Sequence, residues 1–346
     1  MNTVADRPKP DLHHVRRILV IKLRAIGDVL LSTIVLPNLR AAFPDAQIDF
    51  LTEAPARSVV EGHPALDHAI IFHPAKDSII RLFVKLHRIR YDLVIDLFCN
   101  PRSAQMCFAT RAAIRAGYPF RGRAWAYTSH VTQRSGEIHN TEFNLDALRH
   151  LGIPIVERRV SMPCSAEDAA WADAVIAPLR ATGRRIVALN PSGTWQTKRW
   201  PLGKFAALAD LLVREDGVLP LLLWGPGEES DIQEIETLMH ERAYRPPPST
   251  LPQLAALLAR CDAMISNDAG PMHIGAAVGI PVLGIFGPTN PLLQGPFNPR
   301  STWVRREDLE CIACNKTSCA IGTVCMTDLT VDAVADAYRS LANREL

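Results

Sequence analysis

Residues 263–291, AMISNDAGPMHIGAAVGIPVLGIFGPTNP, decide the fold of this chain because they place two aliphatic strands on either side of a loop and a short helix. Short aliphatic runs of this kind are typical of buried strands in a parallel sheet. The segment DAGP at 268–271 marks the turn into a helix predicted over 271–278, in which proline suits the first position. A helix that begins here directs unsatisfied backbone N–H groups at the loop, an arrangement that binds phosphate. In a simpler interpretation Asp268 only caps the helix and Gly270 only eases the turn.

Short aliphatic strands alternate with amphipathic helices along the whole chain, in two successive sets. This order is typical of parallel sheets with helices on both faces. The stretch 152–166 has prolines and charges but no helical periodicity, so it is predicted to link the sets. We expect an α/β protein of two Rossmann-like domains facing across a cleft, 1–160 and 161–330, followed by 331–346 with a last helix that packs back on the first domain. Pro37 is expected to kink the first helix. Strands are predicted at 17–23, 47–51, 69–72, 93–98, 114–117, 186–190, 219–224, 263–266 and 282–286, and helices at 29–43, 78–90, 102–112, 202–214, 228–241, 251–260, 271–278 and 331–342.

Composition narrows the possible partners and compartments. The chain has 346 residues with 38 basic and 36 acidic side chains, so its formal charge of +2 gives no overall field for binding nucleic acid. No apolar run approaches the roughly 20 residues of a membrane span, and the first residues are polar where a secretory signal is apolar. We therefore expect a cytoplasmic protein. Arg16, Arg17 and the basic stretch 85–90 are candidates for contact with an anionic membrane, or simply form a solvated face.

The eight cysteines fall into an isolated set and a clustered set. Isolated cysteines among apolar or small residues usually behave as small buried hydrophobes. The cluster C-x2-C-x4-C-x5-C predicts a structural Zn²⁺ site, since no secretory signal points to disulfides. It lacks two paired C-x-x-C knuckles, so a reduced loop without metal is the alternative. The isolated cysteines are Cys99, Cys107, Cys164 and Cys261, and the clustered ones are Cys311, Cys314, Cys319 and Cys325.

The loop after the first strand carries the first candidate catalytic group. Ligands bind at the carboxyl ends of parallel strands, so residues that follow strands are the main candidates for a site. In LRAIGD, Gly27 permits a tight turn and Asp28 stands at the mouth of an apolar helix. A carboxylate there can act as general base toward a hydroxyl within hydrogen-bond reach. Alternatively, Asp28 is an N-cap residue favoured by the helix dipole.

The loop PSGTWQTKRWP, 191–201, offers hydroxyls, backbone N–H groups and a lysine after a buried strand. Hydroxyl and N–H groups bond phosphate oxygens, and Lys198 can place a positive charge on a leaving diphosphate. In the alternative, the loop is solvated and Trp195 and Trp200 pack in the core. The predicted phosphate contacts come from Ser192, Gly193, Thr194 and Thr197.

The loop WGPGEE, 224–229, ends another strand with two carboxylates. Acidic residues at this place in nucleotide-binding folds accept the hydroxyls of a ribose. Alternatively, Glu228 and Glu229 only add favourable charge to the first turn of a helix. The chain has no G-x-G-x-x-G after a strand, no G-x4-G-K-[ST] and no G-x-S-x-G, so nicotinamide enzymes, P-loop hydrolases and serine hydrolases lack their fingerprints here.

Four segments together resemble one enzyme family over nearly the whole chain. The segments at 18–53, 190–212, 265–291 and 311–334 are similar to those of the family 9 glycosyltransferases, the lipopolysaccharide heptosyltransferases. The resemblance implies a GT-B fold and inverting transfer of a heptose from ADP-heptose to the lipid A–linked inner core of lipopolysaccharide. It places the enzyme peripherally at the cytoplasmic face of the inner membrane. It leaves open the acceptor hydroxyl and the step in core assembly.

The resemblance also implies roles for particular residues. Asp28 matches the family's base, Lys198 its diphosphate-contacting lysine and Glu229 its ribose-contacting glutamate. The loop under the diphosphate matches Asp268, Ala269 and Gly270. Some members have threonine in place of Ala269, so this chain keeps only the backbone contact there. His273 follows in the next helix and positions the donor or is structural.

The implied reaction is a single displacement. The general base deprotonates the acceptor hydroxyl as it attacks the anomeric carbon, and ADP leaves from the opposite face with inversion. The leaving charge falls on Lys198, the loop hydroxyls and the helix N-terminus. No Asp-x-Asp motif is present, so no cofactor is expected to be required for catalysis.

Acceptor contacts are expected from the loops 99–103 and 121–139. Arginines suit acidic or phosphorylated saccharides, although solvated arginines are an equal alternative. The arginines in question are Arg102, Arg121, Arg123 and Arg134.

Rival interpretations keep the same two-domain fold. One is a nucleotide-sugar epimerase, which acts on the donor alone, and another is a transferase of the same family with a different sugar donor. A third is a two-lobed binding protein that closes around its ligand without chemistry. A fourth gives the cysteine segment a zinc-held contact with a partner protein, which metal analysis tests.

Overall fold

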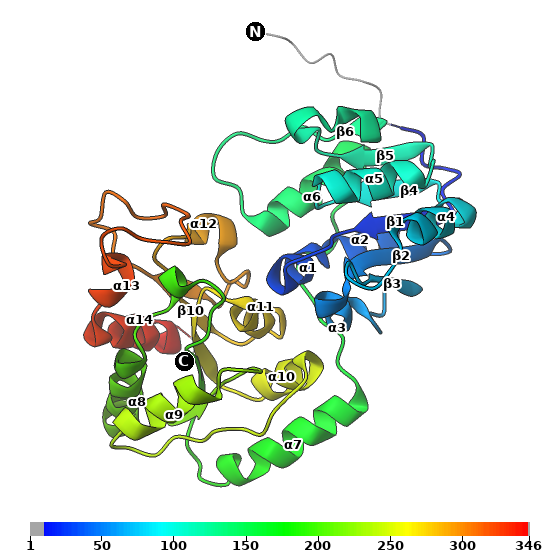
Figure 1. The fold of residues 1–346 in the computed structure, drawn as a ribbon. Helices are drawn as coiled ribbons and strands as arrows, with labels where there is room; N and C mark the ends of the chain where they lie inside the picture. The colour runs from blue at the N-terminus through cyan, green and yellow to red at the C-terminus, as the bar shows by residue number, and fades with distance from the viewer. Residues whose placement is uncertain (1–9, 345–346) are drawn as a thin grey trace. The chain divides into compact units, whose positions relative to one another are not determined.

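The computed structural model describes residues 10–344, which form two compact units. The units are Met1–Pro163 and Cys164–Leu346, so the division falls just after the predicted end of the first domain at 160. Each unit has one parallel sheet with helices around it (Figure 1). The predicted α/β class with two parallel sheets is therefore confirmed.

The first unit contains a six-stranded sheet in the order β3-β2-β1-β4-β5-β6. Every neighbouring pair is parallel. The connection runs outward from β1 to β3 and then returns to β4 on the other side of β1, so the strand order reverses between β1 and β4. The central strands β1 and β4 are aliphatic and buried, as a sheet covered on both faces requires. The strands are β1 (Arg17–Ile21), β2 (Gln47–Glu53), β3 (His68–Phe72), β4 (Leu93–Asp96), β5 (Ile114–Gly117) and β6 (Ser129–His130).

The helix predicted over 29–43 is two helices, and the break at Thr33 and Ile34 lies one turn before Pro37, where a proline interrupts a helix. The first helix ends at Ser32, and its C-cap residue Thr33 donates through Oγ1 to the Leu30 carbonyl at 2.8 Å. Pro37 is the third residue of the second helix, where its missing N–H has no intrahelical acceptor to lose. The helices of the first unit are α1 (Ile26–Ser32), α2 (Val35–Ala42), α3 (Arg57–Val60), α4 (Ile79–Ile89), α5 (Pro101–Ala109) and α6 (Asn140–Leu151), with 3₁₀ turns η1 (Ala54–Ala56), η2 (Phe120–Gly122) and η3 (Ala124–Ala126).

The second unit contains a five-stranded parallel sheet in the order β11-β10-β9-β7-β8. Its strand order reverses between β7 and β9. The strands are β7 (Ile186–Asn190), β8 (Leu219–Leu222), β9 (Ala263–Asn267), β10 (Val282–Ile285) and β11 (Thr302–Val304). The helices are α7 (Ala166–Arg180), α8 (Leu202–Asp216), α9 (Glu229–Leu238), α10 (Leu251–Leu258), α11 (Gly270–Ala277), α12 (Pro291–Gln294), α13 (Val324–Thr327) and α14 (Val331–Asn343), with a 3₁₀ turn η4 (Gln196–Lys198).

The last helix, α14, packs inside the second unit. It lies against α8 and also contacts β10 and β11 (Figure 1). Its buried residues Val334, Tyr338 and Leu341 join the hydrophobic core around Trp200 and Phe205. The apolar face of α14 is thus covered within the second unit, and packing on the first domain is not needed to bury it.

Helix α11 packs on its sheet with a glycine facing the strands. A Cβ at Gly275 would meet the Met264 sulfur at 2.8 Å and the Val282 side chain at 3.1 Å. Both neighbours belong to strands on which α11 packs, so only glycine allows this approach. The close packing fixes the position of the first turn of α11 at the carboxyl end of β9.

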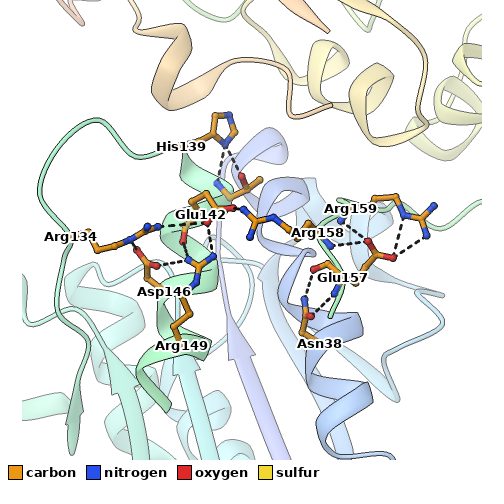
Figure 2. A network of polar contacts seen from close by, with 10 residues as sticks. Asn38, Arg134, His139, Glu142, Asp146, Arg149, Glu157, Arg158 and Arg159 are labelled. Carbon is orange, nitrogen blue, oxygen red and sulfur yellow. Dashed lines mark hydrogen bonds and ion pairs between the residues drawn. The ribbon is translucent and has the colours of Figure 1, made fainter. Parts of the chain in front are cut away.

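The predicted linker has no regular structure over 152–165, but it is held firmly to the first unit. Buried Asn38 in α2 donates to the Glu157 carbonyl at 2.8 Å and accepts from the N–H groups of Val156 and Glu157 at 2.7 and 2.9 Å. Figure 2 shows this contact beside the ion pairs of α6, in which Arg158 reaches Glu142. His63 and Ser161 add a hydrogen bond of 2.8 Å.

Residues 10–344 contain several helices in each unit. None of the helices there is both long enough and apolar enough to cross a bilayer.

Candidate active site

The carboxyl ends of β7 and β9 lie side by side in the second unit. Asn190, the last residue of β7, is opposite Ser266 of β9. Because the strand order reverses between these two strands, this is the switch point at which open parallel sheets bind ligands. The loops that follow the two strands carry Lys198 and Asp268.

Lys198 and Asp268 form an ion pair at this edge of the sheet. The Lys198 Nζ lies 2.7 Å from Asp268 Oδ2, and the Thr289 hydroxyl donates to the same oxygen at 2.6 Å. The lysine ammonium also lies 4.5 Å from the ring centroid of Trp195, within the range of a cation–π interaction. Asp268 is buried and Lys198 largely buried, so both side chains are fixed. Thr289 was missed in the sequence, although its place in a loop after a strand was a usable signal.

Asp268 does not cap α11, so the simpler interpretation of the opening segment is wrong. The N-cap residue is Ala269, which has no side chain able to accept a hydrogen bond, and Pro271 is the second helical residue. The carboxylate of Asp268 instead bonds Lys198 and Thr289. The helix begins with no side-chain acceptor from its N-cap, the condition that suits an anionic ligand.

The loop 191–201 agrees in part with each of its two interpretations, the phosphate-binding loop and the solvated loop with tryptophans in the core. The Ser192 hydroxyl donates to Asn190 Oδ1 at 2.8 Å and the Thr197 hydroxyl to the Lys316 carbonyl at 2.9 Å, whereas Thr194 is exposed. Gly193 is buried, and its carbonyl accepts from Arg199 Nε at 2.7 Å. Trp200 packs in the core as the alternative expected, but the partly buried Trp195 contacts Lys198 instead.

The loop after β8 separates the two glutamates. Glu228 is the N-cap residue of α9, and its carboxylate accepts the Gly225 N–H at 2.8 Å. Glu229 is the first helical residue and is exposed. Of the two glutamates, Glu229 is therefore the more exposed at the carboxyl end of the sheet. His273 is buried in α11.

Asp28 lies in the first turn of α1 at the carboxyl end of β1. It is the third helical residue and not the N-cap, and among residues 10–344 its carboxylate accepts one long bond of 3.4 Å, from the Ala25 N–H. Gly27 is the second residue of the helix and has no left-handed φ, so its backbone conformation does not require glycine. The half-buried carboxylate is available for a further hydrogen bond.

Lys22 and Asp96 were missed in the sequence and lie at the ends of β1 and β4. The Lys22 Nζ donates to the Leu97 carbonyl at 3.1 Å. Burial lowers the pKa of Lys22, while the nearby carboxylates of Asp28 and Asp96 oppose this shift. A lysine directly after a buried strand in the motif K-L-R-A-I-G-D was the available signal.

Asp96 stabilises the loop after β4 through hydrogen bonds. It is fully buried and accepts from the N–H groups of Phe98 and Cys99 at 3.0 and 2.9 Å and from the Tyr127 hydroxyl at 2.9 Å. Burial raises the pKa of Asp96 and also raises the pKa of Cys99 to about 12. The thiol of Cys99 is therefore held neutral, as expected of an isolated cysteine.

Two of the four acceptor-loop arginines form ion pairs. Arg102 lies 2.7 Å from buried Glu53, and Arg134 lies 2.7 Å from Asp146 on α6 (Figure 2). Arg121 and Arg123 form no ion pair with any residue between 10 and 344. Arg102 also lines a cavity of about 540 Å³ together with Asn100, Gln105 and Asp77.

The cysteine cluster does not assemble the predicted zinc site. Three of its members, Cys311, Cys314 and Cys319, are exposed, while Cys325 packs in the core of the second unit. Within the described part of the chain, no three His, Cys, Asp or Glu side chains are grouped so as to hold a metal ion. Among the isolated cysteines Cys99, Cys107 and Cys261 are buried, and the prediction is wrong for exposed Cys164.

Known proteins resemble the chain along almost all its length. A sequence profile of glycosyltransferase family 9 (heptosyltransferase) matches residues 79–324. A lipopolysaccharide heptosyltransferase 1 from Pseudomonas aeruginosa is 26% identical over 327 residues, covering 88% of this chain and 87% of the relative. A family 9 glycosyltransferase structure from Veillonella parvula has a TM-score of 0.83 at 24% identity and covers 97% of this chain and 99% of its own. An Escherichia coli heptosyltransferase structure with ADP-2-deoxy-2-fluoro heptose has a TM-score of 0.69 at 21% identity, covering 94% and 99%. The expected GT-B fold is confirmed by these structures.

Proposed function

Because the chain belongs to glycosyltransferase family 9, the heptosyltransferase family, we propose that it moves a heptose from ADP-heptose onto the inner core of lipopolysaccharide. The name of the Pseudomonas relative supports the acceptor, and the ligand in the Escherichia coli structure supports the donor. The observation that carries the proposal is the meeting of Lys198, Asp268 and the uncapped first turn of α11 at the switch point of the second sheet.

The second unit supplies the donor site in this proposal. The diphosphate lies against the first turn of α11, where the Gly270 N–H has no side-chain cap and where Ala269 and Gly270 are small enough for a close approach. Lys198 is held by Asp268 so that its charge meets the diphosphate as ADP leaves. The exposed carboxylate of Glu229 accepts from the ribose hydroxyls. The remaining proposed donor contacts are Ser192, Gly193, Thr194 and His273.

The first unit supplies the base and the acceptor loops. Asp28 accepts the proton of the acceptor hydroxyl while that oxygen forms a bond to the anomeric carbon. The bond from that carbon to the diphosphate oxygen breaks on the opposite face, and its electron pair leaves with ADP. A single displacement of this kind inverts the anomeric configuration. Arg121 and Arg123, which have no described ion-pair partner, are available for acidic groups of the acceptor.

The acceptor is lipid-linked, so the proposal places the protein peripherally at the cytoplasmic face of the inner membrane. Residues 10–344 contain no helix able to span that membrane. Contact is then made by a surface of the folded protein.

The test is an ADP-release assay with ADP-heptose and a panel of truncated core acceptors. The protein should release ADP with one truncation and very little without acceptor. Asp28→Asn should lower kcat by roughly 10²–10⁴-fold, because the amide accepts no proton. The matched control is Asp45→Asn, which changes an exposed aspartate of the same unit. Full activity in Asp28→Asn, or no turnover with any acceptor, would overturn the proposal, and conversion of the donor alone would favour an epimerase.

A further inference from the structure

We propose that an apolar and basic surface formed by α4, α5 and the η3 turn of the first unit docks on an anionic lipid bilayer. This inference rests on the proposed function, because only a lipid-linked acceptor requires the enzyme to work at a membrane. We call this surface the α4–α5 patch and define it by Ile80, Val84 and Trp125 with Lys85, Arg88 and Arg111. It contains two adjoining depressions of about 480 and 570 Å³ that share Val84 and Arg88.

The apolar side chains of the patch are exposed without a covering element. Ile80 is 69% exposed, Val84 44% and Trp125 53%. The described residues include eight exposed large hydrophobic side chains, and three of these eight lie together on this one surface. Ile80 and Val84 are one helical turn apart on α4, which already buries Leu82 and Leu86 on its other side. The helix therefore has a second apolar face, which its own unit does not use.

An aromatic pair extends this face from α4 to α5. Phe108 of α5 and Trp125 of η3 make an edge-to-face contact with ring centroids 5.2 Å apart. The guanidinium of Arg111 lies 4.4 Å from the Phe108 ring centroid. Tryptophan and arginine in such contact are typical of the interface of a bilayer, where one end of the side chain is apolar and the other is wet.

The charge of the patch is entirely positive. Its depressions are lined by Arg81, Lys85, Arg88 and Arg111 and by no aspartate or glutamate. None of these four side chains makes an ion pair with another residue in the range 10–344. By contrast, Arg17, which the sequence also suggested for membrane contact, donates to the Ile89 carbonyl at 2.7 Å and so fastens the end of α4. Unpaired cations beside exposed aliphatic groups match the anionic surface and apolar interior of a bilayer.

A bilayer explains the patch better than nucleic acid does. Proteins bind nucleic acid through cationic and aromatic side chains, but nucleic acid makes no apolar contact that would cover the exposed side chains of Ile80 and Val84. The chain as a whole also carries a formal charge of only +2. The positive charge is therefore local to a surface that also carries aliphatic groups.

The experiment measures binding of the full chain to vesicles without lipopolysaccharide. Vesicles of pure phosphatidylcholine are compared with vesicles containing phosphatidylglycerol, by co-sedimentation at low and high salt. The wild type should bind the anionic vesicles and lose binding as salt increases. Lys85→Gln with Arg88→Gln should weaken binding roughly 30-fold, because each basic residue near the surface contributes about 1 kcal/mol. Ile80→Ser with Trp125→Ser should weaken it at least about tenfold.

Matched controls come from the second unit. Arg214→Gln with Arg242→Gln removes two exposed cations, and Leu238→Ser with Trp303→Ser removes two exposed apolar groups, without touching the patch. Both controls should bind like the wild type. The proposal is overturned if the wild type ignores anionic vesicles, if the controls weaken binding as much as the patch variants do, or if a single-stranded oligonucleotide binds the patch more tightly than the vesicles.

A lipid-free core saccharide separates this proposal from the proposed function. The variant Lys85→Gln with Arg88→Gln, which lies on α4 and outside the acceptor loops, should release ADP with that acceptor at the wild-type rate, since no membrane is involved. Vesicle binding without any heptosyl transfer would leave the docking surface standing and overturn the function. Heptosyl transfer without vesicle binding would leave the function standing and overturn the docking surface.

Discussion

Lys198 is positioned by a carboxylate of its own unit before any ligand arrives. Its ammonium lies 2.7 Å from Asp268, so the lysine does not have to be ordered when the donor binds. Lys198→Gln keeps a hydrogen-bond donor beside Asp268 but removes the charge. We expect kcat/KM for the donor to fall roughly 10²–10³-fold, as for loss of a group that stabilises a leaving anion. Steady-state ADP release measures this change.

A neighbouring lysine provides the control for that substitution. Lys316 is exposed, and only its backbone carbonyl contacts the loop 191–201. Lys316→Gln should leave kcat/KM unchanged. Equal losses in the two variants would show that general positive charge, and not the held lysine, acts on the donor.

His63 makes the stability of the first unit dependent on pH. Its Nδ1 accepts the Ala65 N–H at 3.2 Å and its Nε2 lies 2.8 Å from the Ser161 hydroxyl, so the buried ring is neutral. Burial lowers the pKa of His63 to about 4. Because the unfolded chain takes up a proton near pH 6.5, stability is present above that value and is lost as the pH falls toward about 4. Denaturant unfolding should show a loss of about 2 kcal/mol between roughly pH 7 and pH 4.5 from this group.

A pair of histidine variants isolates that contribution. His63→Asn should be less stable at neutral pH but should show a flatter pH dependence over the same window. His14→Asn, which changes an exposed histidine, should follow the wild-type curve. An unchanged pH dependence in His63→Asn would assign the acid sensitivity to other groups.

Strands were predicted more completely than helices, and the reason lies in what each element buries. The strands around β1 and β7 are aliphatic runs buried on both faces, so composition alone located them. Helix α6 was missed because its buried face includes Thr141, Asn144 and Asp146, which break the apolar periodicity. Helix α7 was missed although Ser165 and Asp168 form a capping box that marks its start.

The segment after α6 depends on one side chain of α2. Asn38 uses both its amide N–H and its carbonyl oxygen to hold Val156 and Glu157. Asn38→Ala leaves these backbone groups without partners, at a cost of at least about 1–3 kcal/mol for local opening. Amide hydrogen exchange of the segment 153–163 should therefore become at least about tenfold faster, while β1 and β4 stay protected.

Arg159 provides the control in the same segment. Its side chain is 85% exposed and pairs only with Glu157. In Arg159→Ala, hydrogen exchange of the segment 153–163 should equal that of the wild type within experimental error, because exposed ion pairs contribute little to stability. Unchanged exchange in Asn38→Ala would mean that the segment is held elsewhere, for instance by His63 and Ser161.

At the scale of the molecule, the proposed donor and acceptor residues come from two separate sheets, and the sequence predicted them only through the strand ends of each sheet. Lys198 and Asp268 are distant in the chain, and the parallel register of β7 and β9 brings them together. Each had been assigned to a loop after a strand, but their direct contact depends on side-chain packing that no local pattern encodes. Lys22 and Asp96 were missed for the same reason, since their neighbours come from separate strands. The spacing of the clustered cysteines did not predict their environment, since three of them are exposed and residues 10–344 contain no grouping of side chains able to hold a metal ion.

In the proposed reaction, Asp28 of the first unit activates the acceptor, and Lys198 with α11 of the second unit receives the leaving ADP. The most direct measurement is the anomeric configuration of the heptosyl product, determined by NMR after transfer from ADP-heptose to the accepted core saccharide. The account predicts one product with the configuration opposite to that of the donor, formed by the wild type and reduced at least about 10²-fold in Asp28→Asn. A product that retains the donor configuration, or one formed equally by Asp28→Asn, would contradict it.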